Sequence, residues 1–311
     1  EHSAMFEVSW CVGLYVTVLL LEFLPVPLER YGYTRALELW KTWQGAYVAF
    51  AVTLFVYLMS RSLLYAAGAV IVFGTLAWIF RAREAKPEPI LLAIAAVTLS
   101  TMHQSSLGSL FLLMPEQLSR VWWSPAMPVS FFLSSIAAGT AVVVLVEMWI
   151  AKGWKRPLRM EQLAALGQIT FWSLFVYLVF RLGDMALRGQ LAGAFTGRLG
   201  MLFAIEITLG GIVPLVLLAS RSLRRQPALL CTGTLLVAAG IAFNRLNVVL
   251  LAQHLAGPMP YVGPELYTPS IVEWGISIGL IAATIFLFGL AARLLPLLPK
   301  DEGEQVRVVL A

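Results

Sequence analysis

Repeated apolar runs of about 20 residues are the feature that most constrains what this chain can fold into. Stretches such as CVGLYVTVLLLEFLPV, AGTAVVVLVEMWIA and WGISIGLIAATIFLFGLAARLL carry very little charge. A helix of about 20 residues crosses the hydrocarbon core of a bilayer. Open sheets cannot satisfy their backbone hydrogen bonds there, and barrel strands are shorter and alternate in polarity. The sequence therefore predicts an all-α polytopic membrane protein.

About nine transmembrane helices are expected along the 311 residues. The predicted spans cover residues 5–24, 43–60, 62–80, 89–113, 126–150, 161–182, 198–219, 228–251 and 270–294. The composition agrees, because only 13% of the residues are charged and soluble domains carry roughly twice that share. Residues 299–311 are polar, and we expect them to form a short cytoplasmic tail.

Basic residues gather in alternate loops, and this pattern predicts the orientation in the membrane. The basic loops are LERYGYTRALELWK, RAREAK, AKGWKRPLRM and SRSLRRQ, followed by the C-terminal end. We expect this side, with the C-terminus, to be cytoplasmic. Trp122, Trp123, Tyr261 and Tyr267 fall in the other loops and are expected in an outer aromatic belt. The net charge of +5 therefore reflects topology and does not indicate nucleic-acid binding.

The residues that bind electron-transfer cofactors are scarce. The two cysteines, Cys11 and Cys231, lie in apolar runs, so a disulfide framework and an iron–sulfur cluster are not expected. The chain has three histidines, His2, His103 and His254, whereas a cytochrome b with two haems needs four histidine ligands. Phosphate-binding glycine loops and hydrolase motifs are also missing from the sequence. We expect no metal site, haem or iron–sulfur cluster in this chain.

Polar and ionisable residues inside the predicted spans are unevenly distributed between the two membrane faces. Such residues cost about 2.5–3.5 kcal/mol to insert, so they indicate functional sites. Those in the outer half of the spans are Glu7, His103, Gln104, Ser105, Ser106, Ser109, Arg181, Asp184, Glu206, Asn244, Arg245, Asn247 and Glu273. The inner half holds fewer, Glu22 and Glu147. The asymmetry predicts one polar pocket that opens toward the outer face of a helix bundle.

The stretch TMHQSSLGSL is the densest part of this pattern. His103, Ser106 and Ser109 recur every three residues and share one helix face, and Gly108 permits a neighbouring helix to approach closely. The serines also suit a simple role in helix packing.

Structural ion pairs are an alternative explanation for the charged residues. Arg181 with Asp184 fits a pair at a helix end, and Glu206 with Arg245 fits a pair between neighbouring spans. Glu7, Glu273, Glu22 and Glu147 lie close enough to the membrane interface to be solvated or to snorkel.

Several motifs together resemble a known family. FEVSWCVGLYVTVLLLEFLPVPLER, TMHQSSLGSL, RLGDMALRGQLAGAF and FAIEITLGGIVPLVLL, followed by YTPSIVEWGISIGLIA, are similar to the NrfD/PsrC family of membrane subunits, and within it to the HybB branch. The resemblance covers residues 1–298, apart from 40–88, which we expect to be a two-helix insertion. Since family members usually carry about three helices before the first of these motifs, we expect upstream helices to be missing from this sequence.

The resemblance implies a quinone-binding membrane subunit of a respiratory redox complex. Such subunits exchange electrons between menaquinone or ubiquinone and a ferredoxin-like iron–sulfur subunit on the periplasmic face, and they hold no haem themselves. Further partners would be catalytic subunits or a multihaem cytochrome, and the chain would be a quinone-reactive or non-catalytic part of the enzyme. The location would be a bacterial or archaeal cytoplasmic membrane.

Residue roles follow from the same resemblance. Glu7 and His103 are expected to exchange protons at the quinone headgroup. The residues expected to bind or tune it are Gln104, Ser106, Arg181, Asp184, Glu206, Arg245 and Glu273. Glu22 and Glu147 are candidates for an inner proton route.

Two other kinds of protein remain as alternatives. A secondary transporter would need a site at the membrane midplane and often has inverted repeats, which this sequence does not show clearly. A structural membrane anchor would leave the quinone to bind elsewhere in the complex.

Overall fold

The structure is a computed structural model that describes residues 4–40, 43, 50, 53–54, 57, 62–82, 88–113, 115, 118–251 and 270–295. All regular elements in these ranges are helices, which confirms the predicted all-α class. The chain divides into two compact units. Unit 1 holds Ser9–Leu99 and Thr268–Ala311, and unit 2 holds His2–Val8 and Ser100–Tyr267.

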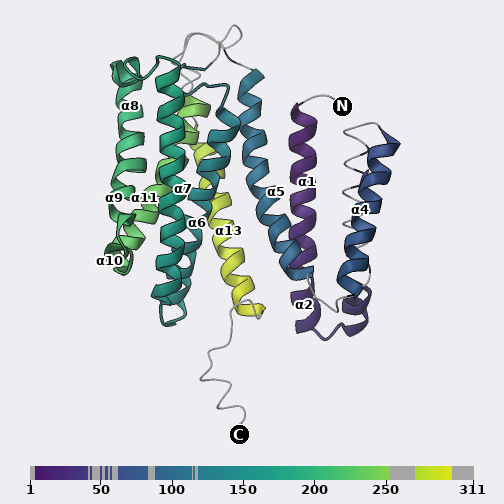
Figure 1. Cartoon of the computed structure of the whole chain (residues 1–311). Helices are drawn as coiled ribbons and strands as arrows, with labels where there is room; N and C mark the ends of the chain where they lie inside the picture. Colours follow the sequence, from purple (N-terminus) through teal and green to yellow (C-terminus); the bar gives the residue numbers. More distant parts are fainter. Residues whose placement is uncertain are drawn as a thin grey trace. The chain divides into compact units, whose positions relative to one another are not determined.

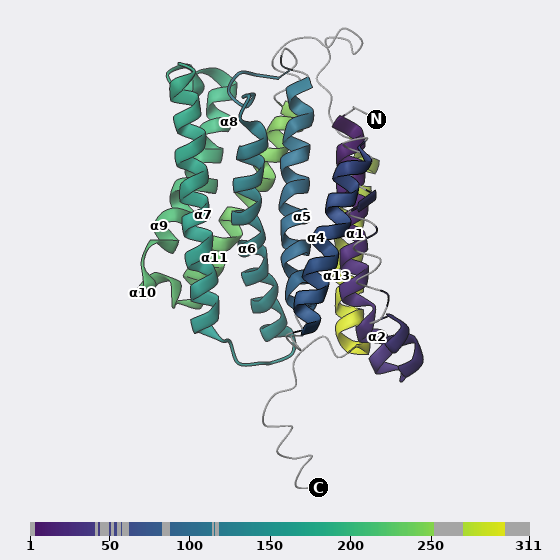
Figure 2. The ribbon, with the colours of Figure 1, turned by 45° about the vertical axis from the view of Figure 1, so that its right-hand side comes forward.

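Unit 2 is a bundle built around three long helices, α6 (Met127–Gly153), α7 (Met160–Leu187) and α11 (Pro227–Leu246). Figures 1 and 2 show them side by side, and α6 makes the most extensive contacts, with α7 and α11. The shorter elements of unit 2 are η1 (Phe111–Leu113), η2 (Gly193–Phe195), α8 (Gly197–Ile207), η3 (Thr208–Ile212), α9 (Val213–Ala219), α10 (Arg221–Arg224) and η4 (Asn247–Leu251). The C-terminal part of α5 (Glu88–Leu110) also belongs to it.

The buried face of α6 explains why it lies at the centre of unit 2. Phe131, Ser134, Ala137, Ala141 and Val144 are three or four residues apart, and all five are buried. Alanine and serine at the middle positions let neighbouring helices approach closely, which is how helices pack in membranes. Large apolar side chains lie on the opposite faces of the bundle and are exposed, as expected for lipid contact.

A contact between two glycines fixes where α11 crosses the α8–η3–α9 segment. A Cβ atom added to Gly210 would lie 2.6 Å from the Cα of Gly240. Real Cβ atoms do not approach so closely, so only glycine fits on both sides of this crossing. The crossing lies one turn beyond Glu206 on one side and one turn before Asn244 on the other.

Each of the two crossing helices, α8 and α11, is followed by a π-helical turn. η3 begins two residues after Glu206, and η4 begins directly after α11 ends at Leu246. Such turns are rare in proteins and are frequent at functional sites. The residues just before these turns are therefore candidates for a functional site.

Unit 1 contains α1 (Ala4–Phe23) from Ser9 onward, α2 (Pro25–Arg30), α4 (Leu63–Ala82), the N-terminal part of α5 and α13 (Ile271–Leu294). Its described buried side chains include Val18 and Leu21 of α1. The indole Nε1 of Trp40 donates a hydrogen bond of 3.4 Å to the Leu21 carbonyl. No described residue of α13 is buried, as expected for an apolar helix that faces lipid.

The expected count of about nine spans is not confirmed. Six helices within the described ranges are long and apolar enough to cross a membrane. The predicted span 43–60 falls mostly outside the described residues. The predicted span 198–219 is among the six, as Leu199–Ala219, although it is divided into α8, η3 and α9. Six candidate spans are sufficient to make the chain a multi-pass integral membrane protein.

Candidate functional site

A buried ion pair lies near one end of unit 2. The guanidinium of Arg181, on α7, is 2.9 Å from the Glu206 carboxylate, on α8. Arg181 is 9% exposed and Glu206 is 5% exposed. Charges this deeply buried remain ionised only when they are paired and hydrogen-bonded. The pair therefore depends on the polar groups around it.

Three neutral side chains complete the hydrogen bonds of the Glu206 carboxylate. Trp122 Nε1 and Asn247 Nδ2 donate to Oε2 at 2.9 and 2.7 Å, and Asn244 Nδ2 donates to Oε1 at 2.9 Å. On the other side of the pair, Arg181 Nη1 donates to the Tyr177 hydroxyl at 2.7 Å. We call this set (Trp122, Tyr177, Arg181, Glu206, Asn244 and Asn247) the Glu206 network.

Arg245 extends the network toward α6. Its guanidinium lies over the ring of Phe131, 3.4 Å from the centroid. Nη1 donates to Asn244 Oδ1 at 2.9 Å, and Nη2 donates to Ser134 Oγ at 2.7 Å. Asn244 thus donates to Glu206 and accepts from Arg245, so the two charges are linked through a neutral amide.

A second ion pair holds the loop that carries Trp122. Arg188, the C-cap residue of α7, lies one turn after Asp184, and its Nη2 is 2.9 Å from Asp184 Oδ2. Arg188 Nη1 also donates to the carbonyls of Arg120 and Trp123, at 3.1 and 2.8 Å. Because Trp122 lies between these two carbonyls, Arg188 positions the indole that donates to Glu206.

A small hollow of about 20 Å³ opens beside these residues. Its lining includes Ser130, Tyr177, Arg181, Asp184, Arg188, Asn244 and Arg245 together with apolar side chains. This volume holds about one water molecule and is far smaller than a typical ligand pocket. A larger ligand would have to lie at its mouth or displace a side chain.

Two predicted ion pairs are wrong, although their members are in the predicted region. Glu206 pairs with Arg181 and not with Arg245, and Asp184 pairs with Arg188 and not with Arg181. The physical reason is that Asn244 intervenes between Arg245 and Glu206. Arg181 is held by Glu206 and Tyr177, and Asp184 precedes Arg188 by four residues, the favourable order for an acid and a base on a helix.

The α5 residues of TMHQSSLGSL lie beside the start of α6. A Cβ atom added to Gly108 would lie 2.9 Å from the Met127 carbonyl oxygen, which confirms the predicted close helix approach. Ser106 Oγ donates to the Met102 carbonyl of its own helix at 3.1 Å. His103 and Gln104 are half-buried, and His103 Nδ1 is a buried atom with no hydrogen-bond partner among the described residues.

The remaining predicted residues are not part of the Glu206 network in the described part of the chain. Glu7 is in α1, but its side chain is outside the described part of the chain. Glu273 belongs to unit 1, where its carboxylate accepts from the Ser270 backbone at 2.6 Å in a capping box at the start of α13. Glu22 and Glu147 are exposed.

Sequence reasoning misplaced one residue of the site. Trp122 was expected in an outer aromatic belt, but it is 5% exposed and bonded to Glu206. Its neighbour Trp123 is half-buried and donates to the Phe111 carbonyl at 3.2 Å. Tyr177 and Ser134 were missed as well, although Tyr177 could have been found because it precedes Arg181 by one helical turn.

Potential metal and haem ligands do not gather in the described part of the chain. In the described ranges, no three residues of the types His, Cys, Asp and Glu gather closely enough to hold a metal ion. His103 is the single histidine that these ranges contain, so they do not offer the two axial ligands of a bis-histidine haem.

The fold and the Glu206 network together define a multi-pass integral membrane protein with a buried, charged site at one end of a helix bundle. The family described as polysulphide reductase, NrfD matches residues 40–256, and the chain belongs to this family. The matched range includes residues 40–88, for which a two-helix insertion stays a prediction.

Two named relatives extend the comparison. The integral membrane subunit of menaquinone reductase from Nitratidesulfovibrio vulgaris is 28% identical over 329 residues, covering 96% of this chain and 66% of the relative. An Escherichia coli protein named as the probable Ni/Fe-hydrogenase 2 b-type cytochrome subunit is 28% identical over 302 residues, covering 96% and 64%. The chain thus spans slightly less than two thirds of these relatives. No solved structure matches it.

Proposed function

We propose that this chain is the quinone-binding membrane subunit of a multi-subunit respiratory redox complex. It would exchange electrons between the quinone pool and an iron–sulfur subunit at the outer face, and other subunits would carry out the catalysis. Membership of the NrfD family and the similarity to a menaquinone reductase subunit support this proposal. The name of that relative favours menaquinone over ubiquinone.

The Glu206 network with its adjoining hollow is the observation that carries the proposal. A quinone has two carbonyl oxygens that need hydrogen-bond donors, and its reduction takes up two protons with two electrons. Arg245, Ser130 and Tyr177 line the hollow and carry donor groups. Since the hollow holds only about one water molecule, we place the quinone ring at its mouth and the water between the ring and the charged residues.

Proton exchange at the ring needs a group that titrates near neutral pH or a carboxylate. His103 fits this need, because its Nδ1 is buried without a partner among the described residues and an imidazole nitrogen can accept or donate a proton. Glu7 remains our second candidate. Gln104, Ser106, Arg181, Asp184, Glu206 and Arg245, all in unit 2, keep their proposed roles in binding or tuning the ring. Glu273 belongs to unit 1 and stays a candidate from the sequence alone.

The membrane and partners follow from the same proposal. We place the chain in a bacterial or archaeal cytoplasmic membrane with its C-terminus inside. A ferredoxin-like iron–sulfur subunit on the periplasmic face would take or give the electrons, beside catalytic subunits or a multihaem cytochrome. We propose that the chain itself holds no haem or iron–sulfur cluster. An absorption spectrum of the purified chain that lacks a Soret band is the expected result.

The test is the binding of a fluorescent quinol-site inhibitor to the purified complex. We expect stoichiometric quenching in the wild type and weaker binding in His103→Ala and Glu7→Gln, with subunit content unchanged. Glu161→Gln is the control, because Glu161 is exposed in the first turn of α7, at the other end of that helix from Arg181. Unchanged binding in both test variants would place the quinone elsewhere.

A structural anchor is the second candidate function. One observation favours it, since the charges of the Glu206 network already have partners and leave a hollow of about 20 Å³. In that case the network would only hold helices together, and neither His103→Ala nor Arg245→Gln would change inhibitor binding or quinone reduction.

Glu22 and Glu147 remain candidates for an inner proton route. If they conduct protons, replacing both with glutamine lowers the number of protons translocated per electron in vesicles containing the complex. An unchanged ratio would exclude them. Both side chains are exposed, which is also compatible with snorkelling to the membrane interface.

A further inference from the structure

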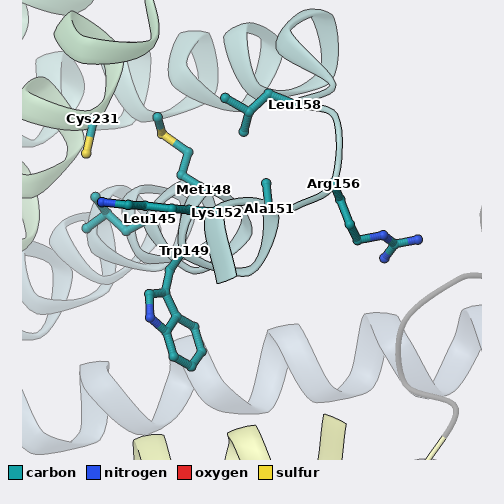
Figure 3. Close-up of a pocket in the computed structure, with 8 residues that line it drawn as sticks. All are labelled: Leu145, Met148, Trp149, Ala151, Lys152, Arg156, Leu158 and Cys231. Atoms are coloured by element: carbon teal, nitrogen blue, oxygen red, sulfur yellow. The ribbon is translucent and has the colours of Figure 1, made fainter. Parts of the chain in front are cut away.

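A second, larger hollow lies in unit 2 at the opposite end of α6 from the Glu206 network. Its volume is about 450 Å³, and it is lined by Leu145, Met148, Trp149, Ala151, Lys152, Arg156, Leu158 and Cys231 (Figure 3). Lys152 and Ser134 are 18 positions apart in the same helix, or about 27 Å at 1.5 Å per residue. This hollow, which we call the α6-end pocket, is thus separate from the proposed quinone site.

One face of α6 forms part of the wall of this pocket. Leu145, Met148 and Lys152 are spaced by three and four residues, so they share a face that is apolar toward the membrane centre and basic at the helix end. Figure 3 shows the Lys152 side chain extending back in the direction of Leu145 and Cys231. Its ammonium group has no hydrogen bond or ion pair with a described residue. Glu147 lies on another face.

A tight turn brings the second basic residue back to the same pocket. The Arg156 backbone N–H donates to the Ala151 carbonyl at 2.8 Å, and Trp154 N–H donates to the Ile150 carbonyl at 2.9 Å. Lys155, between them, has a left-handed φ of 53°. The Arg156–Ala151 bond and the left-handed residue before it are features of a Schellman turn, which normally has glycine at that position. These backbone hydrogen bonds set the position of the Arg156 backbone relative to Lys152.

The chemistry of the lining selects a ligand that is anionic at one end and apolar at the other. Trp149 is paired edge to face with Trp154, with ring centroids 6.0 Å apart, and tryptophan favours the level of the lipid headgroups. Basic pockets between transmembrane helices bind lipid phosphates, while leucine and methionine accept acyl chains. A soluble anion would leave the apolar wall unused.

We propose that the α6-end pocket binds one anionic phospholipid, with its phosphate held by Lys152 and Arg156 and an acyl chain along Leu145 and Met148. The two basic side chains extend in opposite directions in Figure 3, so they would turn toward the phosphate when the lipid binds. Charge complementarity carries this assignment. The loop from Lys152 to Arg159 contains four basic residues and no acidic one, so a zwitterionic headgroup gains less there than a phosphatidylglycerol headgroup. The lipid would join the end of α6 to Leu158 and Cys231.

The experiment titrates phosphatidylglycerol into the delipidated, full-length chain in detergent, and native mass spectrometry counts the bound lipids. We expect one tightly bound phosphatidylglycerol and no equally tight phosphatidylcholine. The double variant Lys152→Gln with Arg156→Gln should bind it about 30-fold more weakly, since each basic residue near an anionic headgroup contributes about fivefold. Each single variant should show about the fivefold loss.

The matched control removes the same charge from the same loop. Lys155→Gln with Arg159→Gln changes two basic residues that do not line the pocket, so the tightly bound lipid should remain. Equal losses in both double variants would overturn the proposal in favour of nonspecific attraction, and so would no loss in either. Displacement of the lipid by millimolar glycerol phosphate would show a soluble-phosphate site and contradict the proposed role of the apolar wall.

Discussion

The Glu206 network and the loop that follows α6, at opposite ends of unit 2, differ in how their charged residues are surrounded. At one end, Arg181 and Glu206 are buried, and each is held by neighbouring polar groups. At the other end, Lys152 and Lys155 are exposed, and the φ of Lys155 is left-handed. Figures 1 and 2 show both ends in one bundle, with α8 and α10 at opposite ends of it.

The difference shows what each end requires of its surroundings. Burying a charge is costly unless a partner and hydrogen bonds compensate, so the Glu206 network depends on residues from four separate segments. Exposed charges cost little and can remain unpaired until a ligand arrives. Changes in the Glu206 network should therefore affect stability strongly, and changes at the exposed Lys152 and Lys155 should affect it weakly.

The largest effect is expected from Glu206→Gln. This change leaves the Arg181 guanidinium buried without its counter-charge, and breaking a buried pair typically costs about 3–5 kcal/mol. Unfolding of the purified chain by detergent titration measures the loss. Glu161→Gln, an exposed site, should stay within about 0.5 kcal/mol of the wild type. Similar values for the two variants would show that the buried pair is not needed for stability.

The glycine crossing offers the next test. Gly240→Ala places a methyl group against the backbone of Gly210, and overpacking of this kind costs about 1–3 kcal/mol. The matched control is Gly183→Ala in α7, where nothing lies within 4 Å of the added atom. That control should be neutral or more stable by up to about 1 kcal/mol. A stable Gly240→Ala protein would mean that the crossing can open at no cost.

A smaller loss is expected from Arg245→Lys. Lysine keeps the charge but cannot stack on Phe131 while it donates to both Asn244 and Ser134. The lost stacking is worth about 1–2 kcal/mol in a desolvated setting. The unfolding titration should show this loss, and inhibitor binding to the complex should weaken with it. Wild-type values for both would show that only the charge of Arg245 matters.

The smallest effect should be a gain, at the exposed end. Lys155→Gly removes the side chain that disfavours the left-handed conformation of the turn, so we expect stability to rise by about 1 kcal/mol. Lys152→Gly should instead lower stability, because glycine weakens the last turn of α6. A loss of stability in Lys155→Gly would show that the lysine charge at the helix end outweighs the backbone strain.

The all-α class could be predicted because apolar runs of about 20 residues satisfy their backbone hydrogen bonds in a bilayer by forming helices. The clustering of Arg181, Glu206, Asn244 and Arg245 could be predicted from their similar depth in neighbouring spans. The partner of each charge could not, because pairing depends on helix rotation, which the π-helical turns alter. Trp122 was misplaced because composition does not reveal that Arg188 holds its loop over the bundle.

The π-helical turns also have a consequence for insertions and deletions. A π turn accommodates more residues than an α turn, so η3 can be regarded as an α-helix with one residue inserted. Deleting a residue there, such as Leu209, would restore an ordinary helix and rotate Glu206 by about 100° relative to α9. The carboxylate would then face away from Asn244 and Asn247. Among homologous sequences, a one-residue gap at this point should therefore coincide with the loss of the acidic residue.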